Sequence, residues 1–197
     1  YRAGYTNAEQ LAEVSMLAQS SGNLDAGLAN DYLMASDAAY QYSGNVEKLT
    51  ALLDAQNQVT NRNAVSMEDL ANATIVSASQ LAGSGIAENE LTALLGTGIA
   101  ATQEDGDAVG RAVNGILMNL QQIQGETGFG TEVLDAEALS KTEERCKSLG
   151  IELKTVENGI TSLRDPMEIL KELAEVYNAL PDGSEQKACI LSDIGTK

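Results

Sequence analysis

The chain has 197 residues, of which 43% are hydrophobic, and its 12 basic and 29 acidic residues give a net charge of −17. A chain of this length forms one or two domains with a real core. So negative a chain repels nucleic-acid phosphates and anionic lipid head groups, so direct contact with either is not expected. No run of about 18 apolar residues occurs, and residues 1–5 lack the pattern of a signal peptide. The sequence therefore predicts neither a membrane span nor a targeting segment.

Aromatic residues make up only 4% of the chain, with one Phe, six Tyr and no Trp. The core must then consist of aliphatic side chains, which suit contacts between helices better than a sandwich or barrel. Apolar residues also recur at steps of three and four, the period of an amphipathic helix. These features predict an all-α protein, a multi-helix bundle or irregular helical array of about nine short helices, with one small β-hairpin near residues 151–163.

Six helices are predicted in the first 123 residues. The fourth opens at Ser66, where a hydroxyl is followed three residues later by the carboxylate of Asp69, a capping-box pattern. Gly96 and Gly98 are expected to weaken the fifth helix. The sixth carries a broad apolar stripe and is expected to be buried centrally. The predicted ranges are 7–20, 24–42, 45–59, 67–81, 88–96 and 107–120.

A glycine-rich segment divides the chain. Residues 124–131 contain three glycines and no hydrophobic period, which is typical of a flexible loop. The expected organisation is therefore an N-terminal helical subdomain (1–123), a flexible loop (124–135) and a C-terminal helical subdomain with the hairpin (136–197).

The C-terminal subdomain is predicted to begin with a charged helix, residues 137–149, that ends at Gly150. Asn158-Gly159 tolerates the positive φ angles of a type I′ turn, so residues 151–163 are predicted to form the hairpin. Asp165-Pro166 then starts a helix with Pro at its first position. A last helix follows the turn at 181–184, and its expected inward residues are Ala188, Ile190, Leu191 and Ile194.

The search for chemistry in the sequence gives no site. The chain contains no His, which removes the commonest general base and the commonest metal ligand. Acidic clusters at 88–90, 104–107 and 143–144 fall at predicted helix starts or on a solvated helix face, where they oppose the helix dipole or face water. The loop 125–130 lacks the preceding strand and the following Gly-Lys-Ser/Thr of a phosphate loop. We therefore expect no enzyme, no catalytic, cofactor-binding or metal-binding residue, and no cofactor.

The sulfur-containing residues are given structural interpretations. Cys146 and Cys189 belong to no CxxC pair and are interpreted as reduced cysteines of an intracellular protein. The methionines occur about one to a helix and are interpreted as core filler: Met16, Met34, Met67, Met118 and Met167.

Longer runs of residues indicate the function more specifically than the short motifs do. The runs at 35–44, 53–70 and 77–86 resemble the core region of bacteriophage tail tape measure proteins. The second half is similar to that family in the order of its features, which are Leu149-Gly150-Ile151, Asn158-Gly159, Leu163-Arg164-Asp165-Pro166 and Leu180-Pro181-Asp182-Gly183-Ser184. The segment before Leu24 is least similar, and Gly110-Arg111 and residues 124–147 depart from the family pattern.

This resemblance implies a structural tail protein that acts as scaffold and length determinant in tail assembly, through helix packing and self-association. It implies assembly in the bacterial host cytoplasm, a place in the lumen of the virion tail, and tail tube and tail assembly chaperone proteins as partners. The chain would be the compact core-region fragment of a longer protein. Some relatives carry peptidoglycan hydrolase domains, but no residue here matches such a motif.

Two other functions remain open from the residues alone. One is a generic intracellular helical adaptor or solenoid that mediates protein–protein contacts, although no fixed sequence period persists beyond two units. Neighbouring genes for tail tube, chaperone and baseplate proteins would separate this alternative from a tail protein. The other is an enzyme that uses carboxylates, which would require a divalent ion bound among Glu104, Asp105 and Asp107.

Overall fold

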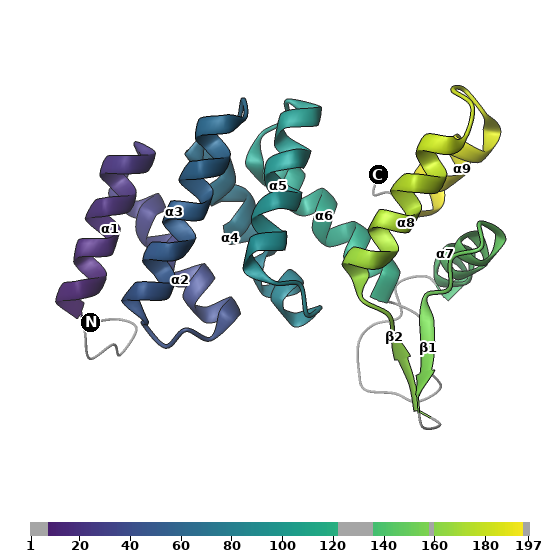
Figure 1. Cartoon of the computed structure of the whole chain (residues 1–197), viewed down its shortest axis with the longest axis horizontal. Helices are drawn as coiled ribbons and strands as arrows, with labels where there is room; N and C mark the ends of the chain where they lie inside the picture. Colours follow the sequence, from purple (N-terminus) through teal and green to yellow (C-terminus); the bar gives the residue numbers. More distant parts are fainter. Residues whose placement is uncertain (1–7, 122–135, 158–159, 195–197) are drawn as a thin grey trace. The chain divides into compact units, whose positions relative to one another are not determined.

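The computed structural model describes residues 8–121, 136–157 and 160–194, and this part of the chain contains nine helices and one two-stranded antiparallel sheet (Figure 1). The predicted all-α fold with a small hairpin is confirmed. The chain divides into two compact units, residues 1–114 and residues 115–197. The loop expected at 124–135 lies outside the described residues. None of the described helices is both long and apolar enough to cross a membrane.

The first unit is an array of helices in two layers. In one layer α1, α3 and α5 lie side by side, and in the other α2 packs along α4 (Figure 1). Helices two positions apart in the sequence thus contact each other, as in helical solenoids. The bounds are α1 (Ala8–Gly22), α2 (Ala26–Tyr40), α3 (Val46–Arg62), α4 (Met67–Gly83), α5 (Glu88–Thr102) and α6 (Gly106–Gln121), whose last residues belong to the second unit.

Helices α2, α3 and α4 begin at residues whose side chains accept backbone N–H groups of the first turn. Asp25 accepts from Gly27 and Leu28, and Asn45 accepts from Lys48. Ser66 Oγ accepts the N–H of Asp69 at 3.0 Å, which confirms the predicted helix start. The buried hydrophobic side chains between the helices are aliphatic apart from Tyr32, and the fully buried ones include Tyr32, Leu49, Leu52, Leu53, Leu70 and Leu81.

The predicted end of the fifth helix at Gly96 was wrong, because α5 continues past Gly96 and Gly98 to Thr102. A Cβ at Gly96 would lie 2.7 Å from Cγ1 of Val59, and one at Gly98 would lie 2.8 Å from Cγ1 of Val109. These glycines therefore cost helix propensity but allow α5 to approach its neighbours closely.

The start of α6 approaches α4 even more closely. A Cβ at Gly106 would overlap the carbonyl group of Asp69, and one at Gly110 would lie 2.9 Å from the carbonyl oxygen of Ala73. One turn further along, Asn114 Nδ2 donates to the carbonyl oxygen of Val76 at 2.8 Å. The two helices thus touch through small residues, and two hydrogen bonds join them, from the N–H of Gly106 to Asp69 Oδ1 and from Asn114 to Val76.

The second unit combines three helices and a hairpin with the end of α6. Its elements are α7 (Ala136–Ser148), β1 (Lys154–Glu157), β2 (Ile160–Leu163), α8 (Pro166–Ala179) and α9 (Glu185–Ile194). The strands pair from Lys154 with Leu163 to Glu157 with Ile160, and the predicted turn at 158–159 lies outside the described residues. The buried cluster comprises Leu120, Cys146, Ile151, Leu153, Ile169, Leu173, Ile190 and Ile194.

Two helices, one in each unit, end in the same way. Gly85 after α4 and Gly150 after α7 have φ angles of +82° and +78°. The N–H of the next residue then donates five residues back, from Ile86 to Leu81 at 3.0 Å and from Ile151 to Cys146 at 2.9 Å. These are Schellman motifs, in which glycine adopts a left-handed conformation and the following apolar residue packs back on the helix.

Several side chains expected in the core are exposed. Met16, Met34 and Met118 are 62%, 46% and 40% exposed and Met167 is partly buried, so only Met67, at 5%, fits the interpretation as buried core filler. In α9 the buried side chains are Ile190 and Ile194, one turn apart. Neighbouring helix positions point about 100° apart, so Leu191 is 59% exposed, and Ala188 also lies at the surface.

Candidate functional site: acidic clusters and the hairpin anchor

The acidic residues at the start of α5 have two different environments. Glu90 Oε2 accepts the N–H of Ala87 at 3.2 Å, so this carboxylate caps the helix as expected of an acidic first turn. Glu88 is half-buried, and burial raises the pKa of its carboxyl group. Only one of the pair is thus explained by helix capping.

The acidic residues before α6 serve that helix. Asp105 Oδ1 accepts the N–H of Ala108 at 2.7 Å, and Asp107 pairs with Arg111 one turn on at 3.0 Å. Within the described residues, no three His, Cys, Asp or Glu side chains are grouped so as to hold a metal ion. The local hydrogen bonds of these carboxylates account for their positions.

The third acidic cluster lies on α7. Glu143 accepts from Lys147 and Lys154, each at 3.2 Å. Burial raises the pKa of Glu143, but the hydrogen bonds from the two lysines outweigh burial and leave it lowered. Because Lys154 belongs to β1, this carboxylate ties α7 to the hairpin.

A shallow polar hollow lies between α7 and α9, lined by Lys141, Glu144, Arg145, Ser148 and Asp193. Arg145 Nε donates to Asp193 Oδ2 at 2.8 Å, and Thr142 Oγ1 donates to the carbonyl oxygen of the same aspartate at 2.8 Å. The charges that line the hollow therefore bind the two helices together.

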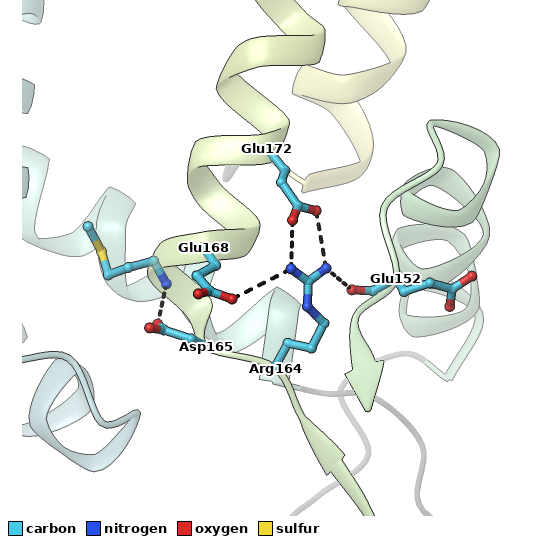
Figure 2. A network of polar contacts seen from close by, with 6 residues as sticks. Glu152, Arg164, Asp165, Glu168 and Glu172 are labelled. Atoms are coloured by element: carbon cyan, nitrogen blue, oxygen red, sulfur yellow. Dashed lines mark hydrogen bonds and ion pairs between the residues drawn. The ribbon is translucent and has the colours of Figure 1, made fainter. Parts of the chain in front are cut away.

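Arg164 follows β2 and joins the hairpin to α8 (Figure 2). Its guanidinium donates to both carboxylate oxygens of Glu172, with Nη1 at 3.1 Å and Nη2 at 2.6 Å, and Nη1 also donates to the carbonyl oxygen of Glu152 at 2.9 Å. Glu168 lies 3.6 Å away, and the backbone N–H of Arg164 donates to Leu153 at 3.0 Å. Such bidentate arginine–carboxylate contacts fix geometry as well as supply energy.

The next residue completes this junction. Asp165 Oδ1 accepts the N–H of Met167 at 2.8 Å and caps α8, with Pro166 at the first helical position as predicted. A hairpin of two strands is marginally stable alone. Here its base is held by Arg164 and the buried Leu153, while the hairpin extends away from the helices of its unit (Figure 1). Val156 on β1 is 68% exposed, so the hairpin offers strand surface for contact.

The role of Arg164 was not predicted from the sequence. A signal was present, since acidic residues lie four and eight positions after Arg164, on one face of the helix that Asp165 opens. The contact with the carbonyl group of Glu152 had no such signal, because it depends on how the hairpin closes.

The cysteines have structural environments. Both are free, and Cys146 is fully buried in the core of the second unit. Burial raises the pKa of the Cys146 thiol to about 11, so it stays protonated at neutral pH. A protonated buried thiol is a poor nucleophile and a poor metal ligand.

A model of the family described as phage-related minor tail protein matches residues 1–195. The chain belongs to this family. No curated protein and no solved structure matches it. As a phage-related minor tail protein the chain is a structural component of the virion tail, which favours a structural over an enzymatic role for the polar contacts of both units.

Proposed function

We propose that this chain is the core region of a tail tape measure protein, a scaffold and length determinant that acts in tail assembly through helix packing and self-association. The family match over residues 1–195 carries the proposal. The residue sequences at 35–44, 53–70 and 77–86 resemble those of tape measure proteins, and this resemblance narrows the proposal from a tail protein to a tape measure protein. In this role the chain lies in the tail lumen after assembly in the host cytoplasm.

The contacts of the described residues support a scaffold. The first unit gains its form from close packing between helices, and the second holds a hairpin with an exposed Val156 on a fixed base. The partners that we propose are further copies of the protein, the tail tube and the tail assembly chaperone. With a net charge of −17, this region makes no direct contact with nucleic acid or membrane. We also propose that it has no catalytic, cofactor-binding or metal-binding residue.

The predicted organisation is part of the proposal. A flexible loop at 124–135 would let the helical subdomains at 1–123 and 136–197 contact different partners. Limited proteolysis tests this organisation, with first cleavage expected inside 124–135. First cleavage elsewhere would contradict it.

An in-frame deletion in the phage gene tests the main proposal. Removal of the codons for residues 8–194 should reduce the number of assembled tails, or change their length, as counted and measured by electron microscopy. A length determinant shortens the tail by about 1.5 Å for each helical residue lost, whereas a scaffold alone lowers the number of tails. Tails unchanged in both number and length would contradict the proposal.

Self-association can be measured on the chain itself. Size-exclusion chromatography with light scattering should give a dimer or a larger species for residues 1–197. A strict monomer would place the assembly contacts outside these residues and remove self-association from the proposed mechanism of this region.

A further inference from the structure

On the surface of the first unit, Tyr40 lies beside both Tyr42 and the acidic start of α5. The rings of Tyr40, at the end of α2, and Tyr42 stack with centroids 5.9 Å apart and planes 23° apart. The hydroxyl of Tyr40 donates to the carbonyl oxygen of Ile86 at 3.4 Å, which places it at the start of α5, where Glu88 is the first residue. All three side chains are partly exposed.

The carboxylate of Glu88 has no ion pair or hydrogen bond with any residue that the structure describes, unlike Glu90 beside it. An anion at a helix N-terminus is normally stabilised by the helix dipole. Burial nevertheless raises the pKa of Glu88, and burial together with the charges of Glu88 and Glu90 raises that of Tyr40 to about 12. The negative charge at this place is therefore poorly compensated within the unit.

A cation already lies against one of the two tyrosines, Tyr42. The Nζ atom of Lys48, on α3, is 5.0 Å from the centroid of the Tyr42 ring, within the range of a cation–π contact. Lys48 is the only Lys or Arg between Arg2 and Arg62. The contact of Lys48 thus shows that the Tyr42 ring accepts a cationic side chain.

We propose that Tyr40, Tyr42 and Glu88 form a binding site for a cationic side chain, Arg or Lys, of a partner protein, and that Lys48 occupies part of this site in the free chain. A guanidinium group can stack on a tyrosine ring while its N–H groups meet a carboxylate. Residues 1–114 contain fourteen acidic and four basic residues, so a basic partner is also favoured at longer range. This inference does not depend on the role in tail length.

A peptide pair tests the chemistry of the ligand. The intact chain is titrated with a short glycine peptide that contains two arginines, and with the same peptide containing citrulline, a neutral analogue of arginine. NMR shifts of the Tyr40, Tyr42 and Glu88 signals should change with the arginine peptide and stay unchanged with the citrulline peptide. Equal shifts with both peptides, or no shifts with either, would overturn the proposal.

Charge-matched variants test the site itself. Glu88→Gln should weaken binding of the arginine peptide by about threefold, the scale of one partly exposed cation contact. Glu68→Gln removes the same charge from an exposed position in the first turn of α4 and should have a smaller effect. Tyr42→Leu should also weaken binding, and circular dichroism shows whether that variant folds. If Glu88→Gln and Glu68→Gln weaken binding equally, the effect comes from net charge alone and the proposal is wrong.

The proposed competition by Lys48 predicts that its removal strengthens binding, whereas the other substitutions weaken binding. Lys48→Met should strengthen binding of the arginine peptide by about twofold, because the ring face becomes available. Arg62→Met removes the same charge from an exposed position and serves as the control. If the two variants bind the peptide equally well, Lys48 does not occupy the site.

Discussion

The two units of this chain are held together by different interactions. In residues 1–114 the only ion pair among the described side chains is Arg111–Asp107, with both side chains at least half exposed, whereas helices touch at glycines. In residues 115–197 ion pairs link separate elements, and these are Arg164–Glu172, Arg145–Asp193 and Lys154–Glu143. The basic residues follow this division, with four in the first unit and eight in the second.

This difference shows how one acidic chain meets two structural needs. The stacked helices of the first unit bury a long aliphatic core, so their stability depends on shape at the contacts. The second unit is smaller and has less apolar surface to bury for its size. Its hairpin and short helices are therefore fixed by charged contacts, which respond to pH and salt as packing contacts do not.

The largest expected effect is a loss of shape complementarity in the first unit. Gly106→Ala would place a methyl group against the carbonyl group of Asp69 and should lower the free energy of unfolding by about 3 kcal/mol. Gly83→Ala is the control, because no atom lies within 4 Å of a Cβ there, and it should gain up to about 1 kcal/mol. Urea unfolding followed by circular dichroism measures both. Similar values for the two variants would mean that close approach does not hold this unit.

A smaller effect is expected from loss of the hairpin anchor. Arg164→Met removes the contacts with Glu172 and Glu152, so hydrogen exchange in β1 and β2 should become about threefold faster while the first unit stays unchanged. Lys171→Met removes the same charge from an exposed position on α8 and should leave the strands unchanged. Equal acceleration by both variants would argue against a specific anchor.

Acidification should act on the two units in opposite directions. Arg164 lowers the pKa of Glu172, and Lys187 lowers that of Asp182, so these carboxylates stabilise the second unit above their ordinary values of 4.5 and 3.8. That contribution is lost as the pH falls through their lowered pKa values. The pKa of Glu88 is raised by burial, so its charge destabilises the first unit at neutral pH. Protonation removes this cost as the pH falls through the raised pKa.

Hydrogen exchange at about pH 7 and about pH 3.5, corrected for intrinsic rates, separates the units within one intact chain. Protection of α8 and the hairpin should fall relative to that of α4 and α5. Glu88→Gln should stabilise the first unit at neutral pH, and this gain should fade toward the ordinary pKa of glutamate. Parallel losses in both units would contradict the assignment of opposite signs.

The smallest effect is expected from salt. An increase from about 0.05 M to about 0.5 M sodium chloride shortens the screening length severalfold. Screening should relieve repulsion among the fourteen acidic residues of residues 1–114, which have few cations beside them. In the second unit the same screening also weakens ion pairs, so protection measured by hydrogen exchange should rise less there. An equal rise in both units would remove the electrostatic contrast.

The features that could be predicted from the sequence depend on neighbours in the chain. The helix starts at Ser66 and Asp165 and the stop at Gly150 use partners within a few residues, and all three were predicted. The hairpin followed from local alternation and an Asn-Gly turn. Such signals can be recognised in the sequence because both partners of each interaction lie within a few residues of each other.

The features that were missed depend on distant partners. The sequence placed the end of the fifth helix at Gly96, because the close approach of Gly96 to Val59 and of Gly98 to Val109 is visible only in the fold. Asn119 lies off the apolar stripe of α6, yet its Nδ2 donates to the carbonyl oxygen of Ile194 at 3.1 Å. The resemblance identified a tail protein at the level of the family, but no motif indicated that Tyr40, at the end of α2, meets the start of α5.

The two Schellman motifs restrict which amino acids these positions accept. Gly85 and Gly150 have open space around the missing side chain, so only the left-handed backbone limits replacement there. Asparagine, which tolerates this conformation, should be accepted, whereas valine or isoleucine should be rejected. In a library of all single substitutions, these turns would differ from Gly106, where any side chain meets the backbone of a neighbouring helix. The pattern of tolerated residues would thus record the backbone angle at two glycines and the distance between helices at the third.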